Sequence, residues 1–149
     1  MLRTIGSVIV GYLVMSIVVF VGLTAAYLAM GADRAFQPGI YEVMAIWLVV
    51  MFAISLLAAF GGGKVCSLVA KSSKAFFGLA GLVLILGLLS AIPSLTASGG
   101  EAKPRASDVP NLEAMMKAEQ PAWVALLMPV IGVGGVLAGG RRGPGKSAT

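Results

Sequence analysis

Residues 42–70 constrain the fold more than any other part of the chain, because they hold a long, almost uninterrupted apolar run. From Val43 to Phe60 the only polar residue is Ser55. About 20 apolar residues, each rising roughly 1.5 Å along a helix, cover the roughly 30 Å hydrocarbon layer of a membrane. The pattern continues beyond three glycines at 61–63, so we predict one tilted transmembrane helix over the whole stretch. The alternative is that the glycines begin a loop, but a loop at that depth would leave backbone polar groups unpaired.

Small residues recur along this predicted helix at spacings of three and one, which place them all on one face. In a membrane such a face lets another backbone approach closely, because burial of apolar surface no longer drives helix association. We therefore expect this face to pack against a neighbouring helix. Its residues are Ser55, Ala58, Ala59, Gly62, Gly63, Cys66, Ser67 and Ala70.

The composition also indicates a membrane protein. Of the 149 residues, 58% are hydrophobic and 11% are charged, and the mean hydropathy is +0.97, whereas a soluble domain carries about 25% charged residues. Three further apolar stretches, 5–30, 75–92 and 121–140, are long enough to cross a bilayer. The first of them is too long for a signal peptide. We therefore predict an all-α integral membrane protein, a four-helix bundle that forms a single domain over residues 1–149 with short connections.

The first and fourth predicted spans also carry small residues along one face. We expect the first span to be the packing partner of the second, through a stripe that consists of Ser7, Gly11, Val18, Gly22, Ala25 and Ala29. In the fourth span, Pro129 removes one backbone donor and should kink the helix. Across the three spans, the expected helix-packing residues are Gly11, Gly22, Ala58, Gly62, Gly63, Cys66, Gly132, Gly135 and Gly139.

The connections between the predicted spans are short except for one. Residues 32–39 form a polar link with a Pro-Gly turn signal, which makes the first two spans antiparallel neighbours. Residues 71–74 predict a tight turn, and the third span is expected to stop before Pro93. The external loop 93–120 is rich in Gly, Ser and Pro. Within it, residues 111–120 predict one short interfacial helix on the membrane surface, with disorder as the alternative.

Basic residues gather on one side of the predicted bundle, which carries seven cations and no acid, whereas the other side carries four cations and all six acids. Because Lys and Arg are enriched in cytoplasmic segments, we predict that both termini are cytoplasmic. The cations expected to anchor the helix ends at lipid headgroups are Lys64, Lys71, Lys74, Arg141 and Arg142. Arg3 and Lys146 complete the seven. Interfacial aromatic belts are predicted at Tyr27, Tyr41, Trp123, Phe76 and Phe77.

One motif near the end of the sequence is a candidate phosphate loop. Residues 140–147, GRRGPGKS, match GxxxxGK followed by Ser or Thr, a pattern that cradles nucleotide phosphates when it lies between a strand and a helix. Here a predicted membrane helix precedes it, so we expect the tail 141–149 to be a basic cytoplasmic segment beside anionic headgroups. We expect no nucleotide as partner, because the motif lacks the preceding strand and the following helix that a phosphate loop needs. We expect no nucleic acid either, because the basic residues lie in short segments beside the spans.

Residues that carry catalysis or ion coupling are sparse. The chain has no His and a single Cys, and no predicted span holds a carboxylate, Arg or His near its middle. Ion-coupled transporters usually place such groups inside the membrane. Cys66 has no His or acid nearby in the sequence and is better explained as a small packing residue than as a nucleophile. We therefore expect no enzyme activity, no cofactor and no metal site.

Three segments carry a resemblance: MLRTIGSVIVGYLVM at the start, GGGKVCSLVAK in the second span and PAWVALLMPVIGVGGVLAGGR at the end. They resemble a group of small bacterial four-span membrane proteins without a known activity. The resemblance implies the same fold and a bacterial inner membrane. We expect a non-enzymatic structural or accessory protein that contacts the lipid bilayer and associates with itself, as a homo-oligomer, or with a larger membrane complex. The alternative is a transporter or channel for a small or neutral solute.

Overall fold

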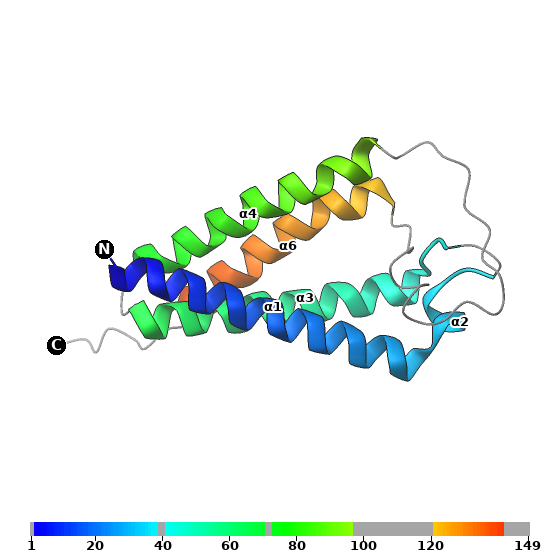
Figure 1. Ribbon diagram of the computed structural model, residues 1–149, viewed down its shortest axis with the longest axis horizontal. Helices are drawn as coiled ribbons and strands as arrows, with labels where there is room; N and C mark the ends of the chain where they lie inside the picture. The colour runs from blue at the N-terminus through cyan, green and yellow to red at the C-terminus, as the bar shows by residue number, and fades with distance from the viewer. Residues whose placement is uncertain (1, 39–40, 71–72, 97–120, 142–149) are drawn as a thin grey trace.

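The computed structural model describes residues 2–38, 41–70, 73–96 and 121–141. The regular structure of these residues is helical, apart from isolated bridge residues in the link after α2, where Phe36 pairs antiparallel with Val43. The prediction of an all-helical fold is therefore confirmed for this part of the chain. The helices, shown in Figure 1, are α1 (Leu2–Met30), α2 (Ala32–Ala35), α3 (Ala45–Ala70), α4 (Ser73–Thr96) and α6 (Ala122–Arg141).

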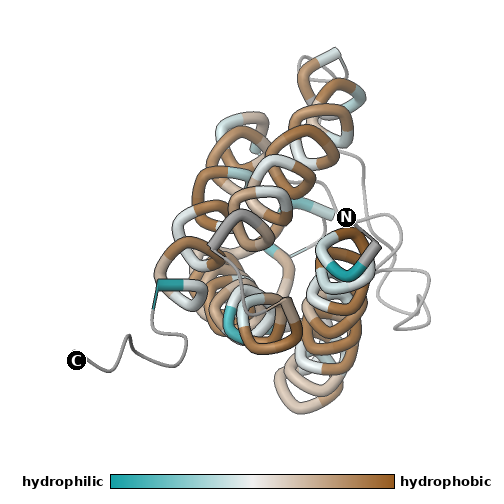
Figure 2. The backbone as a smooth tube through the Cα atoms, turned by 90° about the vertical axis from the view of Figure 1, so that its left-hand side faces the viewer, coloured by the Kyte–Doolittle hydropathy of each residue, from teal (hydrophilic) through white to brown (hydrophobic). Residues whose placement is uncertain are grey.

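Four of these helices are long and apolar enough to cross a membrane, as predicted. The candidate spans contain 28, 26, 19 and 20 residues in chain order. Large apolar side chains cover their outward faces, and Figure 2 shows hydrophobic residues along most of the length of every long helix. Water would not tolerate so continuous an apolar surface, whereas lipid chains would. The outward residues of α1 include Ile5, Ile9, Leu13, Ile17, Phe20, Val21 and Leu28.

The long helices run up and down, with α3 in contact with both α1 and α6. Antiparallel packing of α1 on α3 brings Gly11 against Gly62. The pair α3 and α6 is parallel, because Ala59 lies against Gly135 and Phe60 against Gly139. The helix α4 packs antiparallel to α6, because Gly87 lies against Pro129 and Phe76 against Gly140. In Figure 1, α4 and α6 diverge from α1 and α3 toward the end that carries α2.

Residues 61–63 lie inside α3, which passes through them without a break, as the continuous-helix interpretation expects. The helix begins at Ala45 rather than at residue 42, because Val43 is held in the bridge to Phe36. The expectation that the third span ends before Pro93 is wrong, since α4 continues to Thr96. Thr96 supplies a donor to that last turn: its hydroxyl donates to the carbonyl oxygens of Ile92 and Pro93 at 3.1 and 3.0 Å.

The link between α1 and α3 is folded rather than a simple turn. Gly31 has a φ of +74° and donates its N–H to the Tyr27 carbonyl at 2.8 Å, which ends α1 in a left-handed cap. The short helix α2 follows directly. Backbone N–H groups of Gln37 and Met44 then donate to the carbonyls of Glu42 and Ala35, each at 2.9 Å, and close the bridge.

Several predictions fall on residues outside the described ranges. They concern the greater part of the loop, 97–120, with its short interfacial helix, and the tail 142–149 with the phosphate-loop motif. They also concern the turn residues 71–72.

Candidate functional site

The small-residue face of α3 meets two different helices. On one side, a Cβ added to Gly62 would lie 2.8 Å from the carbonyl oxygen of Gly11 in α1. The reverse substitution is equally crowded, since a Cβ on Gly11 would lie 2.8 Å from the Cβ of Cys66. On the other side, a Cβ on Gly63 would collide with the backbone of Val136 in α6. Two neighbouring glycines therefore serve two interfaces, whereas the sequence suggested α1 as the preferred partner.

The helix α6 approaches this face of α3 as closely as α1 does. A Cβ on Gly135 would lie 2.6 Å from the Cβ of Ala59, and a Cβ on Gly139 would collide with the carbonyl of Phe60. Gly132 points elsewhere: its added Cβ would lie 2.8 Å from Val83 Cγ1 in α4. Ala58 is buried in α3.

The contact row of α1 departs from the predicted stripe. Ser7 and Gly11 are buried, and a Cβ on Gly22 would lie 2.8 Å from Ile54 Cγ2. The expectation for Val18, Ala25 and Ala29 is wrong, because all three are exposed. The residues of α1 that face the bundle instead follow one another at every fourth position. A row with this spacing winds obliquely around the helix, whereas the predicted stripe runs more nearly parallel to the helix axis. The members of the inward row are Ser7, Gly11, Met15, Val19, Leu23 and Tyr27.

Cys66 is fully buried where α1 crosses α3. Its thiol donates to the Ser7 hydroxyl oxygen across 4.0 Å, and that hydroxyl donates to the Thr4 carbonyl at 2.7 Å. A thiol in such a position acts as a small apolar group with a weak donor.

Three of the basic residues are exposed at the end of the bundle opposite α2: Arg3, Lys64 and Arg141. Arg3 also donates from Nε to the Val69 carbonyl at 3.3 Å. That carbonyl belongs to the last turn of α3, where the helix leaves acceptors unpaired and favours a cation. Lys74 lies in the first turn of α4, while Lys71 and Arg142 fall outside the described residues.

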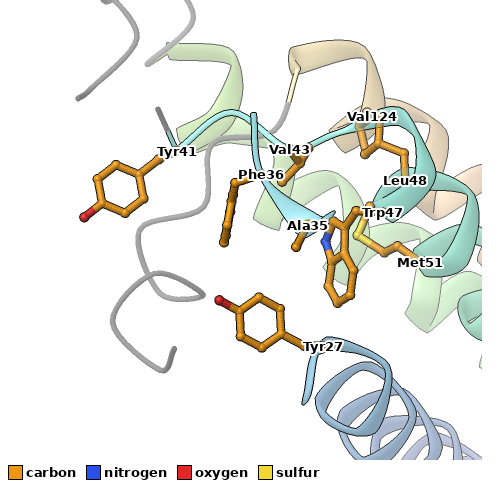
Figure 3. Close-up of a cluster of buried hydrophobic side chains, with 9 residues drawn as sticks. All are labelled: Tyr27, Ala35, Phe36, Tyr41, Val43, Trp47, Leu48, Met51 and Val124. Carbon is orange, nitrogen blue, oxygen red and sulfur yellow. The ribbon is translucent and has the colours of Figure 1, made fainter. Parts of the chain in front are cut away.

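At the α2 end of the bundle, an aromatic cluster replaces part of the predicted interfacial belt. Figure 3 shows Phe36 between Tyr41 and Tyr27, with Trp47 beside Tyr27. Edge-on contacts join these rings, with centroids 6.1 Å apart for Tyr27–Phe36 and 5.7 Å apart for Tyr27–Trp47. The belt prediction is wrong for Tyr27 and Tyr41, which are buried, and for Phe76 at the other end. Trp123 and Phe77 are exposed, as a belt requires.

A cleft of about 290 Å³ lies between the four long helices, and no pattern in the sequence predicted it. Every long helix contributes to its walls. The lining residues are Tyr12, Met15 and Val19 of α1, Ser55 and Ala59 of α3, Val83, Leu86, Gly87 and Ser90 of α4, and Met128, Pro129 and Gly132 of α6. Pro129 stands out in the sequence as a proline inside a predicted span, whereas no sequence pattern marks Gly87, which contacts it in the structure. A Cβ on Gly87 would lie 2.6 Å from Pro129 Cγ, so the pair closes one wall.

The cleft is apolar, with three hydroxyl groups as its polar side chains. Ser90 donates to the Gly87 carbonyl at 2.9 Å, within its own helix. The lining contains no carboxylate, amine, imidazole or thiol, so it has no group suited to acid–base or nucleophilic chemistry near neutral pH. Within the described ranges, no three His, Cys, Asp or Glu side chains lie close enough to hold a metal ion. An apolar lining of this kind suits the binding of a neutral molecule.

Neither the family models nor the curated proteins nor the solved structures contain a match to this chain.

Proposed function

We propose that the chain is a structural or accessory integral membrane protein that associates with itself or with a larger membrane complex. The observation that supports this most directly is the position of α3, which approaches both α1 and α6 at backbone distance through neighbouring residues of one face. Transport by alternating access needs one half of a protein to move against the other. Interfaces closed by Gly62 against Gly11 and by Gly63 against Val136 resist such sliding, because backbone atoms cannot rotate away as side chains do.

We place the protein in a bacterial inner membrane with both termini in the cytoplasm. The exposed cations Arg3, Lys64 and Arg141 at one end of the bundle favour that end as the cytoplasmic one. Anionic headgroups would attract these side chains at that surface. The small residues at the helix contacts, described above, would hold the bundle together once lipid surrounds it.

Association can be tested on protein extracted from native membranes. Crosslinking in the intact membrane, followed by extraction in mild detergent and light scattering, should give a protein mass above the 15.2 kDa of one chain. Mass spectrometry then assigns the excess to a second copy or to a partner present in a fixed ratio. A single chain without any companion, before and after crosslinking and in several detergents, would contradict the accessory role.

A transporter or channel for a small neutral solute is the second candidate, and the cleft beside Pro129 is the observation that favours it. Proline inside a membrane helix leaves one carbonyl without its usual donor, and such positions occur in transport pathways. Proteoliposomes containing the protein should then release a neutral solute faster than vesicles containing a Ser55→Phe variant, whose side chain would fill the cleft. Equal release from both would exclude the cleft as a solute path.

A further inference from the structure

The cleft opens on the side of the bundle between α1 and α4. The interfaces of α3 with α1 and α6, and of α6 with α4, are closed by the glycine contacts described above. The helices α1 and α4 touch toward the Arg3 end, where a Cβ on Gly78 would lie 3.5 Å from Val8 Cγ2. Farther along, the floor of the cleft is buried and its rim is partly or fully exposed. The floor residues are Ala59, Val83, Pro129 and Gly132, and the rim residues include Met15, Val19 and Leu86.

The lining of the cleft extends along the helix axes. Its lining runs from Tyr12 to Val19 in α1 and from Val83 to Ser90 in α4. Each interval is seven residues, which corresponds to about 10 Å at the helical rise. Because the four helices are the candidate spans, this long dimension lies along the direction in which lipid chains extend in a bilayer. A chain could therefore enter sideways between α1 and α4 without leaving the hydrocarbon layer.

The chemistry of the walls selects among possible occupants. Ordered water in a buried site makes about three hydrogen bonds, but the cleft offers three hydroxyl side chains spread over three helices, and that of Ser90 already donates to Gly87. An empty cleft would forfeit the dispersion contacts of its apolar lining. A hydrocarbon chain restores the dispersion contacts and needs no hydrogen-bond partner.

We propose that the cleft binds an acyl chain of a bilayer phospholipid. Its volume of about 290 Å³ is close to the lower limit of roughly 300 Å³ for small-molecule sites, so it holds a segment of one chain and not a whole lipid. The proposal rests on the membrane placement of the bundle but not on its accessory role. The bound chain fills the side of the bundle where the helices leave a gap.

Photolabelling in reconstituted vesicles tests this directly. The full chain is placed in vesicles of phosphatidylcholine that include a phosphatidylcholine with a diazirine on its acyl chain, and adducts are mapped by mass spectrometry. We expect adducts on the floor residues Ala59 and Val83. These adducts should fall severalfold when unlabelled phosphatidylcholine with the same acyl-chain length as the probe makes up a larger share of the vesicle lipid. Adducts confined to outward residues such as Ile9, Leu13 and Ile17 would overturn the proposal, because ordinary boundary lipid gives that pattern.

A matched pair of variants separates the cleft from the general lipid surface. Ser55→Phe adds an aromatic ring inside the cleft, whereas Ala53→Phe adds the same ring on the exposed face of the same helix. The first should lose at least about four-fifths of the floor adducts, and the second should keep them. Leu86→Trp fills the cleft from the opposite wall and repeats the test if the first variant does not fold. Floor labelling that neither cleft variant reduces would overturn the proposal.

Two controls identify other outcomes. A protein that fails to float with the vesicles would contradict its membrane placement, whereas a floating protein without floor adducts contradicts only the occupant of the cleft. Organic extraction of protein purified from native membranes should release phospholipid in a fixed ratio to the chain. A neutral lipid-soluble compound released in that ratio instead would replace the phospholipid as occupant.

Discussion

At the scale of single residues, the three consecutive glycines of α3 are not equivalent. A Cβ on Gly62 would lie 2.8 Å from a backbone oxygen of α1, and one on Gly63 would meet the backbone of α6. Gly61 has no described atom within 4 Å of its added Cβ. The absence of a side chain is therefore needed at two of the three positions.

Alanine at these positions should give opposite results. Gly62→Ala should lower the free energy of unfolding by roughly 1–3 kcal/mol, because backbone atoms must move to admit the methyl group. Gly61→Ala makes the same chemical change in open space and should raise stability by up to about 1 kcal/mol through helix propensity. Unfolding of both variants in the same detergent provides the measurement. Equal stabilities would mean that α1 and α3 do not approach as closely as described.

Residue spacing identified the small face of α3 but not its division between two partners. Ala59 and Gly63 face α6, while Gly62 and Cys66 face α1, and the two sets alternate along one ridge. Spacing within one helix cannot specify this, because it depends on where two other helices lie. The same limit explains Val18. Its spacing of seven residues from Gly11 placed it on the predicted stripe, whereas the oblique crossing of α1 buries a row that advances by four residues.

At the scale of elements, the length of apolar sequence predicted the helices, whereas local interactions set their ends. Val43 has an apolar side chain that fits a span, yet its bridge to Phe36 delays the start of α3. Pro93 was expected to end a helix but is accommodated near the end of α4. Tyr27 and Tyr41 were placed at an interface because Tyr favours it, but the folded link between α1 and α3 buries them in the aromatic cluster.

The end of α1 depends on a left-handed residue. Gly31→Ala should cost about 1 kcal/mol, since a side chain disfavours its φ of +74°. Gly134→Ala is the matched control, because that glycine is helical and has no described atom within 4 Å of its added Cβ. Thermal unfolding of the two variants should show only the first destabilised. A neutral Gly31→Ala would indicate that α1 ends in another conformation.

At the scale of the whole molecule, the charge distribution predicts an orientation. In a Cys66→Ser background, single cysteines at Ser98 and Ser147 should differ in reaction with an impermeant thiol reagent on intact cells. Position 98 should react and position 147 should not, because the rule for Lys and Arg places the tail in the cytoplasm. The reverse pattern would mean that the orientation is inverted. Labelling of neither position would contradict the prediction that residues 93–120 form an external loop.

The fold was more predictable than the candidate site, for a physical reason. A helix that spans a membrane must satisfy its own backbone hydrogen bonds over a long apolar run, which is a property of contiguous sequence. The cleft joins Tyr12, Ser55, Ser90 and Pro129 from four helices. No spacing in the chain links these residues. The helices α1 and α4 touch near Gly78 and diverge beyond it (Figure 1), and the cleft therefore depends on how the bundle is assembled.

The packing of α1 on α3 through the small residues at their crossing can be tested in the membrane with one disulfide. Ser7→Cys places a second thiol where the Ser7 oxygen lies 4.0 Å from the sulfur of Cys66. Gly6→Cys is the control, because no described atom lies within 4 Å of its added Cβ. Each variant carries a protease site in the link after α1. After oxidation in native membranes and cleavage, we expect that only the Ser7→Cys halves stay joined until a reductant is added. Halves that separate in both variants, or stay joined in both, would contradict this packing.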